Sequence, residues 1–448
     1  MKINLIAPKM SLRPMDSELK RLMTPSISLL VLAALTPSEH EVEIIDENLT
    51  PIRDYKNADL VGITCNVDNF ERAKEHSRKY RQNNIPVILG GIFPSSAPEI
   101  AELYATSVCI GEAEPIWKNI LHDAGNGGLK KRYRWDDEYP VEMIPRPKWE
   151  SVDIKKYLYT NVITTSRGCP FSCEFCYNSC IYMKKKFRRR PVSAILEEIA
   201  RLNTRQILFV DDNFIGDKIW LRDFLNAIKP LKLYWHAAVS ADIGKDLALL
   251  DKMRETGCRS LYIGFESINS QSLSSVRKNQ NEVHKYDKTI KEIHDRGIMI
   301  NASMAFGFDD DYPDVFENTL EWLVRNRIET MTGHILTPYP GTKLYKRLEK
   351  EGRIIDRDLW NYNTSKVVFK PKNMTPDELL NGYLNIYKDF YSLKNVLKRK
   401  PKSRQQWLPY LLFNFAYRKF GKLTSKFAMN GNMSRIGKLA RSLSYGIG

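Results

Sequence analysis

The fold of this chain is constrained most by a regular alternation of short apolar strands with amphipathic helices. Within residues 1–125, strand patterns occur at 2–8, 41–46, 58–66, 85–91 and 107–112, and helical spacing fills 26–37, 70–84 and 97–105. Strands that alternate with helices pair into a parallel sheet with helices on both faces. We therefore expect the first 125 residues to form a Rossmann-like, doubly wound α/β domain.

A second run of the same alternation occupies residues 161–350 and contains six strand–helix units. Its strands are expected at 159–166, 206–213, 233–242, 259–267, 298–308 and 328–341. Six such units curve into a partial (β/α)6 barrel, whose functional groups gather at the carboxyl ends of the strands. A Gly-, Pro- and charge-rich linker is expected at 126–160. A helical C-terminal region should follow, with a subdomain at 351–400 and a basic amphipathic tail at 401–448.

Four of the seven cysteines lie within twelve residues, directly after the first strand of the predicted barrel. The spacing is Cys169-x3-Cys173-x2-Cys176, followed by Cys180. No signal peptide or membrane span is evident, so we expect a cytoplasmic chain whose clustered thiols bind metal or act in catalysis. Structural zinc sites usually combine two separated C-x2-C pairs, and only one such pair is present. Three thiolates in one short loop instead favour an iron–sulfur cluster.

The motif C-x3-C-x2-C, with Phe175 before its last cysteine, resembles the signature of the radical S-adenosylmethionine (SAM) superfamily. The resemblance implies that Cys169, Cys173 and Cys176 hold a 4Fe–4S cluster whose open iron binds SAM. It also implies that one electron from the cluster cleaves SAM to methionine and a 5′-deoxyadenosyl radical, which abstracts hydrogen from the substrate. Cys180 has no role in this scheme and is expected to be a buried free thiol.

Polar residues at the other strand ends of the predicted barrel resemble the SAM-binding positions of the same superfamily. Asp212 follows the second strand, where the family contacts the methionine amino group, and Glu266 follows the fourth, at the ribose position. Ser240 and Asp242 follow the third strand, within reach of the SAM carboxylate or the substrate. Each could instead simply cap the next helix. The predicted SAM-contacting residues are Phe175, Asp211, Asp212, Asn213, Ser240, Glu266, Ser267 and Gly307.

The first domain resembles that of the cobalamin-binding radical SAM subfamily, which includes methylases and an anaerobic magnesium-protoporphyrin ester cyclase. The segments LGGIFPSSAPE (89–99) and IGEAEPIW (110–117) match its GG…PE and GE(G/A)E patterns, whereas the cobalt-ligating D-x-H-x-x-G motif is absent. The resemblance implies methyl transfer to an unactivated carbon of a small or lipid-like substrate, with cobalamin as a further cofactor. The predicted cobalamin contacts are Cys65, Asn66, Gly90, Gly91, Gly111 and Glu112.

Two other interpretations of these patterns stay open. One is a radical SAM enzyme of another reaction type, such as a cyclase, with a degenerate cobalamin domain. The other is a non-catalytic iron–sulfur or zinc protein that binds acidic partners.

The net charge of +16 is concentrated near the C-terminus, where no acidic residue follows Asp389 and thirteen Lys and Arg occur between 394 and 441. A basic aromatic segment such as 407–423 can lie on an anionic membrane surface, and we expect peripheral contact of that kind. We do not expect nucleic acid binding, because no recognised module is present. The basic run KKKFRRR (184–190) predicts contact with an acidic flavodoxin- or ferredoxin-type reductant.

Overall fold

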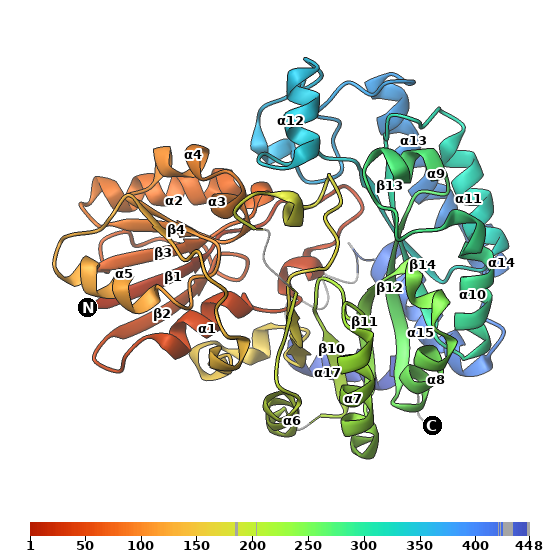
Figure 1. Ribbon diagram of the computed structural model, residues 1–448, viewed down its shortest axis with the longest axis horizontal. Coiled ribbons are helices and arrows are strands. Elements are labelled where there is room, and N and C mark those ends of the chain that lie inside the picture. The colour runs from red at the N-terminus through yellow and green to blue at the C-terminus, as the bar shows by residue number, and fades with distance from the viewer. Residues whose placement is uncertain (184–186, 203, 420, 422, 424–432, 446–448) are drawn as a thin grey trace.

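The computed structural model describes residues 1–183, 187–202, 204–419, 421, 423 and 433–445, and contains two parallel six-stranded sheets beside one another (Figure 1). The first sheet has the strand order β2-β1-β3-β4-β5-β6, a doubly wound arrangement that confirms the predicted fold class. Its strands are β1 (Lys2–Ala7), β2 (Glu41–Asp46), β3 (Leu60–Thr64), β4 (Val87–Gly90), β5 (Ser107–Ile110) and β6 (Arg132–Arg134).

Helices cover both faces of the first sheet because its strands are apolar on both sides. On β1, Ile3 and Leu5 pack with one group of helices and Ile6 with the other. The first group is α1 (Ile27–Leu35) and α5 (Trp117–Gly125), and the second is α2 (Phe70–Gln82), α3 (Ile92–Ser96) and α4 (Pro98–Ala101).

The segment predicted as a structureless linker contributes a strand to this sheet. Residues 132–134 form β6, which pairs in parallel with β5. The three-residue strand escaped prediction because RYR is flanked by charged and turn-forming residues and shows no apolar run. The first sheet therefore extends beyond residue 125.

The second sheet forms the partial barrel that the sequence predicted, with the strand order β14-β13-β12-β11-β10-β7 and every pair parallel. The strands are β7 (Val162–Ile163), β10 (Gln206–Phe209), β11 (Tyr234–Ser240), β12 (Cys258–Glu266), β13 (Met299–Phe306) and β14 (Thr330–Ile335). The helices outside them are α6 (Val192–Arg201), α7 (Lys218–Ile228), α8 (Leu247–Glu255), α9 (Ser270–Ser275), α10 (Tyr286–Asp295) and α11 (Val315–Arg325). A two-residue ribbon, β8 (Ser166–Arg167) with β9 (Arg188–Arg189), flanks the cysteine segment.

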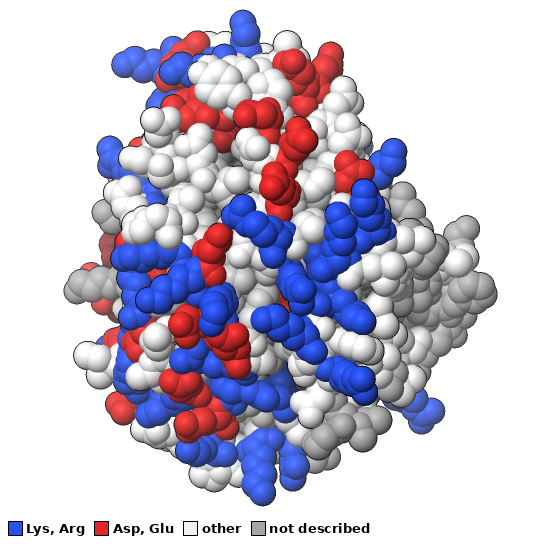
Figure 2. Space-filling model, turned by 90° about the vertical axis from the view of Figure 1, so that its right-hand side faces the viewer, with Lys and Arg blue, Asp and Glu red and all other residues white. Residues whose placement is uncertain are grey.

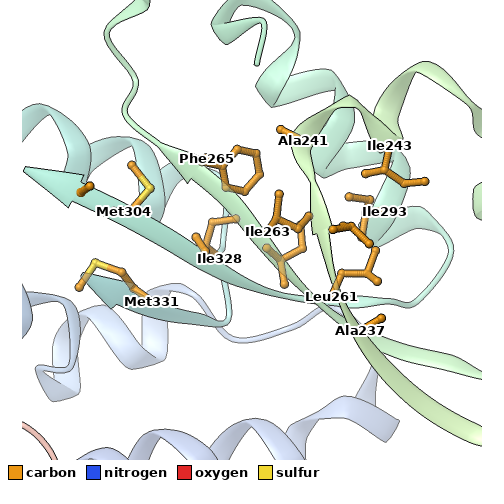
Figure 3. Packing of buried hydrophobic residues seen from close by; sticks show 14 of the residues in the cluster. Ala237, Ala241, Ile243, Leu261, Ile263, Phe265, Ile293, Met304, Ile328 and Met331 are labelled. Atoms are coloured by element: carbon orange, nitrogen blue, oxygen red, sulfur yellow. The ribbon is translucent and has the colours of Figure 1, made fainter. Parts of the chain in front are cut away.

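The barrel core lies between the sheet and its outer helices, as Figure 3 shows for Leu261, Ile263 and Phe265 of β12. Alternate side chains of a strand point to opposite faces, so Tyr262 faces the inside of the barrel. Tyr262 is 36% exposed although its strand lies between two others, and its neighbours Leu261 and Ile263 are fully buried. The inside of the barrel is therefore open to solvent.

The helix packed on the last barrel strand, β14, is α13 (Pro376–Phe390), not the helix predicted directly after that strand. That helix, α12 (Lys343–Lys350), lies beside the cysteine segment, where its Leu344 amide donates to the Glu174 carbonyl at 3.0 Å. The hydroxyl of Tyr387 on α13 bonds both the amide and the carbonyl of Gly333 on β14, at 2.7 and 3.1 Å. Tyr391, one turn later, does the same for Met331. The amphipathic pattern of α12 is real, since Leu344 and Leu348 are buried in the hydrophobic cluster of the barrel, but this helix lies beside the cysteine segment, whereas α13 packs on β14.

The C-terminal region is helical, as predicted. It comprises α14 (Leu393–Lys398), α15 (Trp407–Leu411), a π-helical segment (Leu412–Lys419) and α17 (Met433–Tyr445). Met433 of α17 packs with Leu19, Leu22 and Leu158 near the N-terminal half of the molecule. No helix in the described parts of the chain has the length and apolar character needed to cross a bilayer. Residues 420, 422, 424–432 and 446–448 of the predicted tail lie outside the described residues.

Candidate active site at the junction of the two sheets

The loop that carries the cysteines is fixed by contacts on both of its sides. The Glu174 amide donates to the Val276 carbonyl at 3.0 Å, and the Glu174 carbonyl accepts from the Leu344 amide. The Tyr177 ring stacks on Tyr339, with ring centres 4.8 Å apart. The loop thus has a defined shape that its own sequence, rich in small and turn-forming residues, would not impose.

Of the three cysteines, Cys173 is buried, at 7% exposed, and Cys169 and Cys176 are partly buried. Burial raises the pKa of Cys169 to about 11 and that of Cys176 to about 12. Metal ligands are thiolates, so metal binding here must displace protons. The Gln280 side-chain amide lies 3.6 Å from the Cys173 sulfur, within donor range of it.

In the described residues no three or more His, Cys, Asp or Glu side chains converge as ligands of one metal ion. A structural zinc ion requires such convergence, because all of its ligands bind the same atom. A cuboidal 4Fe–4S cluster does not, because each corner thiolate binds a different iron. The three thiols of the motif lie in one loop, and Cys180 is buried, at 1% exposed; which of the four bind a cluster stays a prediction.

The adjacent aspartates after β10 have different environments. Both oxygens of Asp211 accept hydrogen bonds from the amides or hydroxyls of Thr165 and Ser166, at 2.6 to 3.1 Å. Burial raises the pKa of Asp211 to about 6, against the effect of these donors. The exposed Asp212 instead lines the large cavity described below. Asp211 thus joins two strand ends, and Asp212 is the carboxylate that a ligand can reach.

The two polar residues predicted at the next positions contact one another. The Asn213 amide nitrogen donates to the Ser240 hydroxyl at 3.2 Å, and the Ser240 amide donates back to Asn213 at 3.3 Å. The Ser240 hydroxyl also donates to Asp242, which pairs with Lys218 at 3.2 Å. Both Asn213 and Ser240 are buried and tie the ends of β10 and β11 together.

Glu266 lies at the end of β12 in the left-handed backbone region, with φ of 65°, next to an irregularity in the pairing with β13. Its carboxylate accepts from Lys278 at 3.0 Å and from the Ser303 hydroxyl at 3.2 Å. Burial lowers the pKa of Lys278, but Glu266 and the nearby thiols outweigh burial and raise it above its usual range. The Lys278 ammonium also lies 5.8 Å from the centre of the Phe175 ring.

Two predicted SAM contacts have structural roles in this fold. The Ser267 hydroxyl accepts from the Asn269 amide, which begins the turn into α9. Gly307 has φ of 99°, and a Cβ atom there would lie 2.8 Å from the Leu379 side chain. Its amide donates to Asp311 at 3.0 Å. Gly307 therefore permits close packing against α13.

A cavity of about 620 Å³ lies between the carboxyl ends of the first sheet and the cysteine loop. It brings together every residue predicted to contact cobalamin, namely Cys65, Asn66, Gly90, Gly91, Gly111 and Glu112. Arg167, Gly168, Asn178 and Asp212 line the same cavity from the barrel side. Ligands of doubly wound sheets bind beyond the carboxyl ends of the strands, and this cavity occupies that position.

Glycines shape the wall of this cavity. Gly91 has φ of 99°, and a Cβ atom there would lie 2.8 Å from the Thr64 hydroxyl oxygen and 2.9 Å from the Cys65 carbonyl oxygen. Gly111 has φ of 82° and open space around its missing Cβ. Backbone can therefore approach a ligand at these strand ends.

The two glutamates of the segment GEAE connect the first domain to the barrel. Glu112 accepts two hydrogen bonds from Arg188, at 2.6 and 3.0 Å, and Glu114 accepts from Arg167 at 2.9 Å. Glu112 lies in the wall of the cavity, but its carboxylate is bound by Arg188. Its main role there is therefore to link the first domain to the barrel. The other described arginines of the basic run, Arg189 and Arg190, pair with Asp217 and Glu198. The predicted contact with a reductant thus depends on 184–186, which lie outside the described residues.

Sequence reasoning missed several residues of this site. Lys278, Gln280 and Ser303 contact predicted residues but occupy a loop and a mid-strand position without a recognisable motif. Arg167 and Arg188 flank the cysteine loop and bind the two glutamates of GEAE. The sequence does not reveal these pairs, because they depend on how the two domains pack.

Comparison with family models identifies two segments. Residues 163–323 match the radical SAM superfamily, and residues 342–412 match a domain of unknown function, DUF4070. The second match begins at α12 and includes α13, the helix that completes the barrel wall.

Among curated proteins, the chain is similar to a bacteriochlorophyllide d C-12(1)-methyltransferase of Chlorobaculum tepidum, with 28% identity over 86% of this chain and 87% of the relative. It is also similar to an anaerobic magnesium-protoporphyrin IX monomethyl ester cyclase of Rubrivivax gelatinosus, with 24% identity over 78% and 69% of the two chains. Among solved structures, the radical SAM methyltransferase TsrM of Kitasatospora setae, with cobalamin and a 4Fe–4S cluster bound, aligns with a TM-score of 0.61 and 17% identity over 85% of each chain. The structural likeness shows that the fold is shared.

Proposed function

Because the chain belongs to the radical SAM superfamily and is an enzyme that uses a 4Fe–4S cluster and SAM, we propose that it is a cobalamin-dependent methyltransferase acting on an unactivated carbon. One observation carries this proposal. A single cavity is lined both by the strand ends of the first sheet and by Gly168 and Asp212 beside the cysteine loop. A cofactor held by the first sheet would therefore face the site where SAM is cleaved.

The residues around this cavity fit a ligand that meets both backbone and charged side chains, since the lining combines strand-end glycines with Arg167, Arg188 and Asp212. The volume of about 620 Å³ lies within the range of ligand pockets, and three of its lining glycines, Gly91, Gly111 and Gly168, have positive φ. When bound, the cofactors supply the one-electron cleavage of SAM and the methyl group to be transferred.

In this proposal the chain binds and orients the cofactors. Asp212 receives the ammonium group of SAM, since it is the accessible carboxylate beside the cysteine loop. Glu266 accepts from the ribose hydroxyls, and Lys278 holds the Glu266 carboxylate in place through their 3.0 Å contact. The fixed cysteine loop and the paired arginines Arg167 and Arg188 enclose the space from the barrel side.

Cobalt would have no imidazole ligand from the described residues that line the cavity. Among the described residues that line the cavity, none is a histidine. We expect an absorption spectrum of bound cobalamin without the features of histidine coordination.

The test is anaerobic reconstitution with iron, sulfide and hydroxocobalamin, followed by desalting and measurement of cobalt and iron. Near-stoichiometric cobalt supports the proposal. Gly90→Val should reduce retained cobalt, because an added Cβ at Gly90 meets nothing closer than 3.7 Å and the new side chain occupies the cavity without backbone strain. Gly128→Val, with similar space but outside the cavity, is the matched control.

The second candidate is a different radical SAM reaction, such as cyclisation, with a first domain that no longer retains cobalamin. The cavity without a lining histidine and the similarity to a cyclase favour it. About four irons per chain with no cobalt, and Gly90→Val equal to wild type, would select this candidate over methyl transfer.

A further inference from the structure

The C-terminal helices α14 and α15 expose an unusual number of leucines. Leu393 and Leu397 of α14 are 57% and 66% exposed, and Leu408 and Leu411 of α15 are 45% and 37% exposed. On α14 the exposed pair is separated by one turn, so both side chains lie on one side of the helix. Exposed apolar side chains that lie close together in this way usually mark a binding surface for a protein or a membrane.

The opposite sides of these helices are fixed to the amino-terminal end of the barrel. Arg399, fully buried, donates to the carbonyls of Ile328, Glu329 and Phe390 at 2.7 to 2.9 Å. The Tyr410 hydroxyl of α15 donates to the Val396 carbonyl of α14 at 2.6 Å. Because these inner faces are packed and hydrogen-bonded, the leucines are directed away from the barrel and held in place.

Lysines accompany the exposed leucines. Lys394 and Lys398 are exposed on α14 beside Leu393 and Leu397. No carboxylate follows Asp389 in the sequence, so nothing within these helices neutralises the lysines. Figure 2 shows this side of the barrel, where a band of Lys and Arg with few Asp or Glu borders an uncharged surface.

We propose that this leucine–lysine surface, formed by Leu393, Lys394, Leu397, Lys398, Leu408 and Leu411, binds the headgroup region of an anionic lipid bilayer. Leucines interspersed with lysines suit an interface in which apolar side chains enter the acyl boundary and ammonium groups meet lipid phosphates. A nucleic acid would use the lysines but leave the leucines in water, whereas the acyl boundary of a bilayer accepts the leucines without a partner of matched shape. The surface is distinct from the cofactor cavity, so the proposal is independent of the proposed function.

The test is flotation of the full-length protein with liposomes of phosphatidylcholine containing 30 to 40% phosphatidylglycerol (roughly the anionic fraction at which basic surfaces bind). Wild type should float with these liposomes, and the bound fraction should fall with added salt and on pure phosphatidylcholine. The variants L393Q/L397Q and K394Q/K398Q should each weaken the partition coefficient by about tenfold or more.

Two matched variants test whether the effect belongs to this surface. L103Q/L247Q removes exposed leucines of other elements, and K118Q/K350Q removes exposed lysines elsewhere. Both controls should float like wild type, and all four variants should keep the thermal unfolding midpoint of wild type, since the changed side chains are exposed.

Three outcomes would overturn the proposal. The first is wild type that stays unbound at every lipid composition. The second is a leucine variant that floats as wild type does while only the lysine variant loses binding, which would show that charge alone carries the binding and that the leucines do not enter the bilayer. The third is control variants that weaken binding as much as the surface variants do.

Discussion

At the scale of single residues, neighbours in the sequence perform separate tasks. Asp211 is buried and joins the ends of β7 and β10 through four hydrogen bonds, whereas Asp212 faces the cavity. Asp211→Asn should lower the free energy of unfolding by about 2 kcal/mol, because an amide leaves buried donors facing its NH2 group. Asp212→Asn should leave stability unchanged and raise the Kd for SAM. Denaturant unfolding measures the first effect, and equilibrium dialysis with SAM measures the second. Loss of stability in Asp212→Asn together with weaker SAM binding by a fully stable Asp211→Asn would contradict these roles.

The cysteines provide a second comparison of this kind. Cys173→Ala should abolish cluster absorption near 400 nm (about the region of iron–sulfur charge transfer) and SAM cleavage to methionine. Cys180→Ala is the matched control, since Cys180 is equally buried but lies outside the three-cysteine motif. Iron content, the visible spectrum and methionine release are measured on both variants. Loss of the cluster in Cys180→Ala alone would show that the ligand set has been misassigned.

At the scale of elements, the helix α10 and the segment before β14 are joined by a titratable pair. The His294 ring nitrogen lies 3.1 Å from Glu329, which also accepts from the Ile300 amide at 2.9 Å. Burial lowers the pKa of His294, but the charge and hydrogen bond of Glu329 outweigh burial and raise it above the usual value.

A raised folded-state pKa stabilises the folded protein where the imidazole is protonated, and this contribution is lost as the pH rises through the folded-state pKa. The difference in unfolding free energy between wild type and His294→Asn should therefore be larger at about pH 6, below the ordinary histidine pKa of about 6.5, than at about pH 9, well above it. Urea unfolding at both pH values measures it. If the difference in unfolding free energy between wild type and His294→Asn grew with pH, the prediction that Glu329 stabilises the protonated imidazole would be wrong.

Elements with strong periodicity were predictable from the sequence, and elements defined by distant partners were not. The strands β1 to β5 and the six barrel strands follow from apolar runs separated by turn signals. The three-residue β6 carries no such run, and whether α12 or α13 packs on the last barrel strand depends on Tyr387 and Tyr391 reaching β14. The three cysteines of the motif could be singled out because they lie close together in the sequence, and their role as cluster ligands stays a prediction. The Lys278 contact with Glu266 was not, because its position follows only from the fold.

At the scale of the whole molecule, the first domain and the barrel meet around one cavity and are held together beside it by charged pairs. Arg188 and Glu112 are 11% and 16% exposed and share two hydrogen bonds. Gly341 contributes close contact, since a Cβ atom there would lie 1.9 Å from the Ser96 carbonyl oxygen of α3. The shape of the cavity therefore depends on contacts outside either sheet.

A double-mutant cycle with Glu112→Gln and Arg188→Gln should give a coupling free energy of about 1 to 2 kcal/mol, since the pair is bidentate and mostly buried. The exposed pair Arg146 and Glu150, which is 37% and 62% exposed, should give less than about 0.5 kcal/mol in the same measurement. Equal coupling in the two cycles would mean that Arg188 and Glu112 do not hold the domains together.

Tyr387 and Tyr391 also determine when, during synthesis, the edge of the barrel sheet is covered and can no longer pair with another chain. An open sheet ends in a strand whose unpaired amides and carbonyls can template pairing with another chain. Here the edge strand β14 ends at residue 335, whereas the hydroxyls that occupy its edge belong to Tyr387 and Tyr391. A nascent or truncated chain that stops before α13 therefore has six strands and an uncovered edge. During that interval a chaperone can shield the uncovered edge of β14, and without such protection the edge can pair with a second copy of the chain and aggregate.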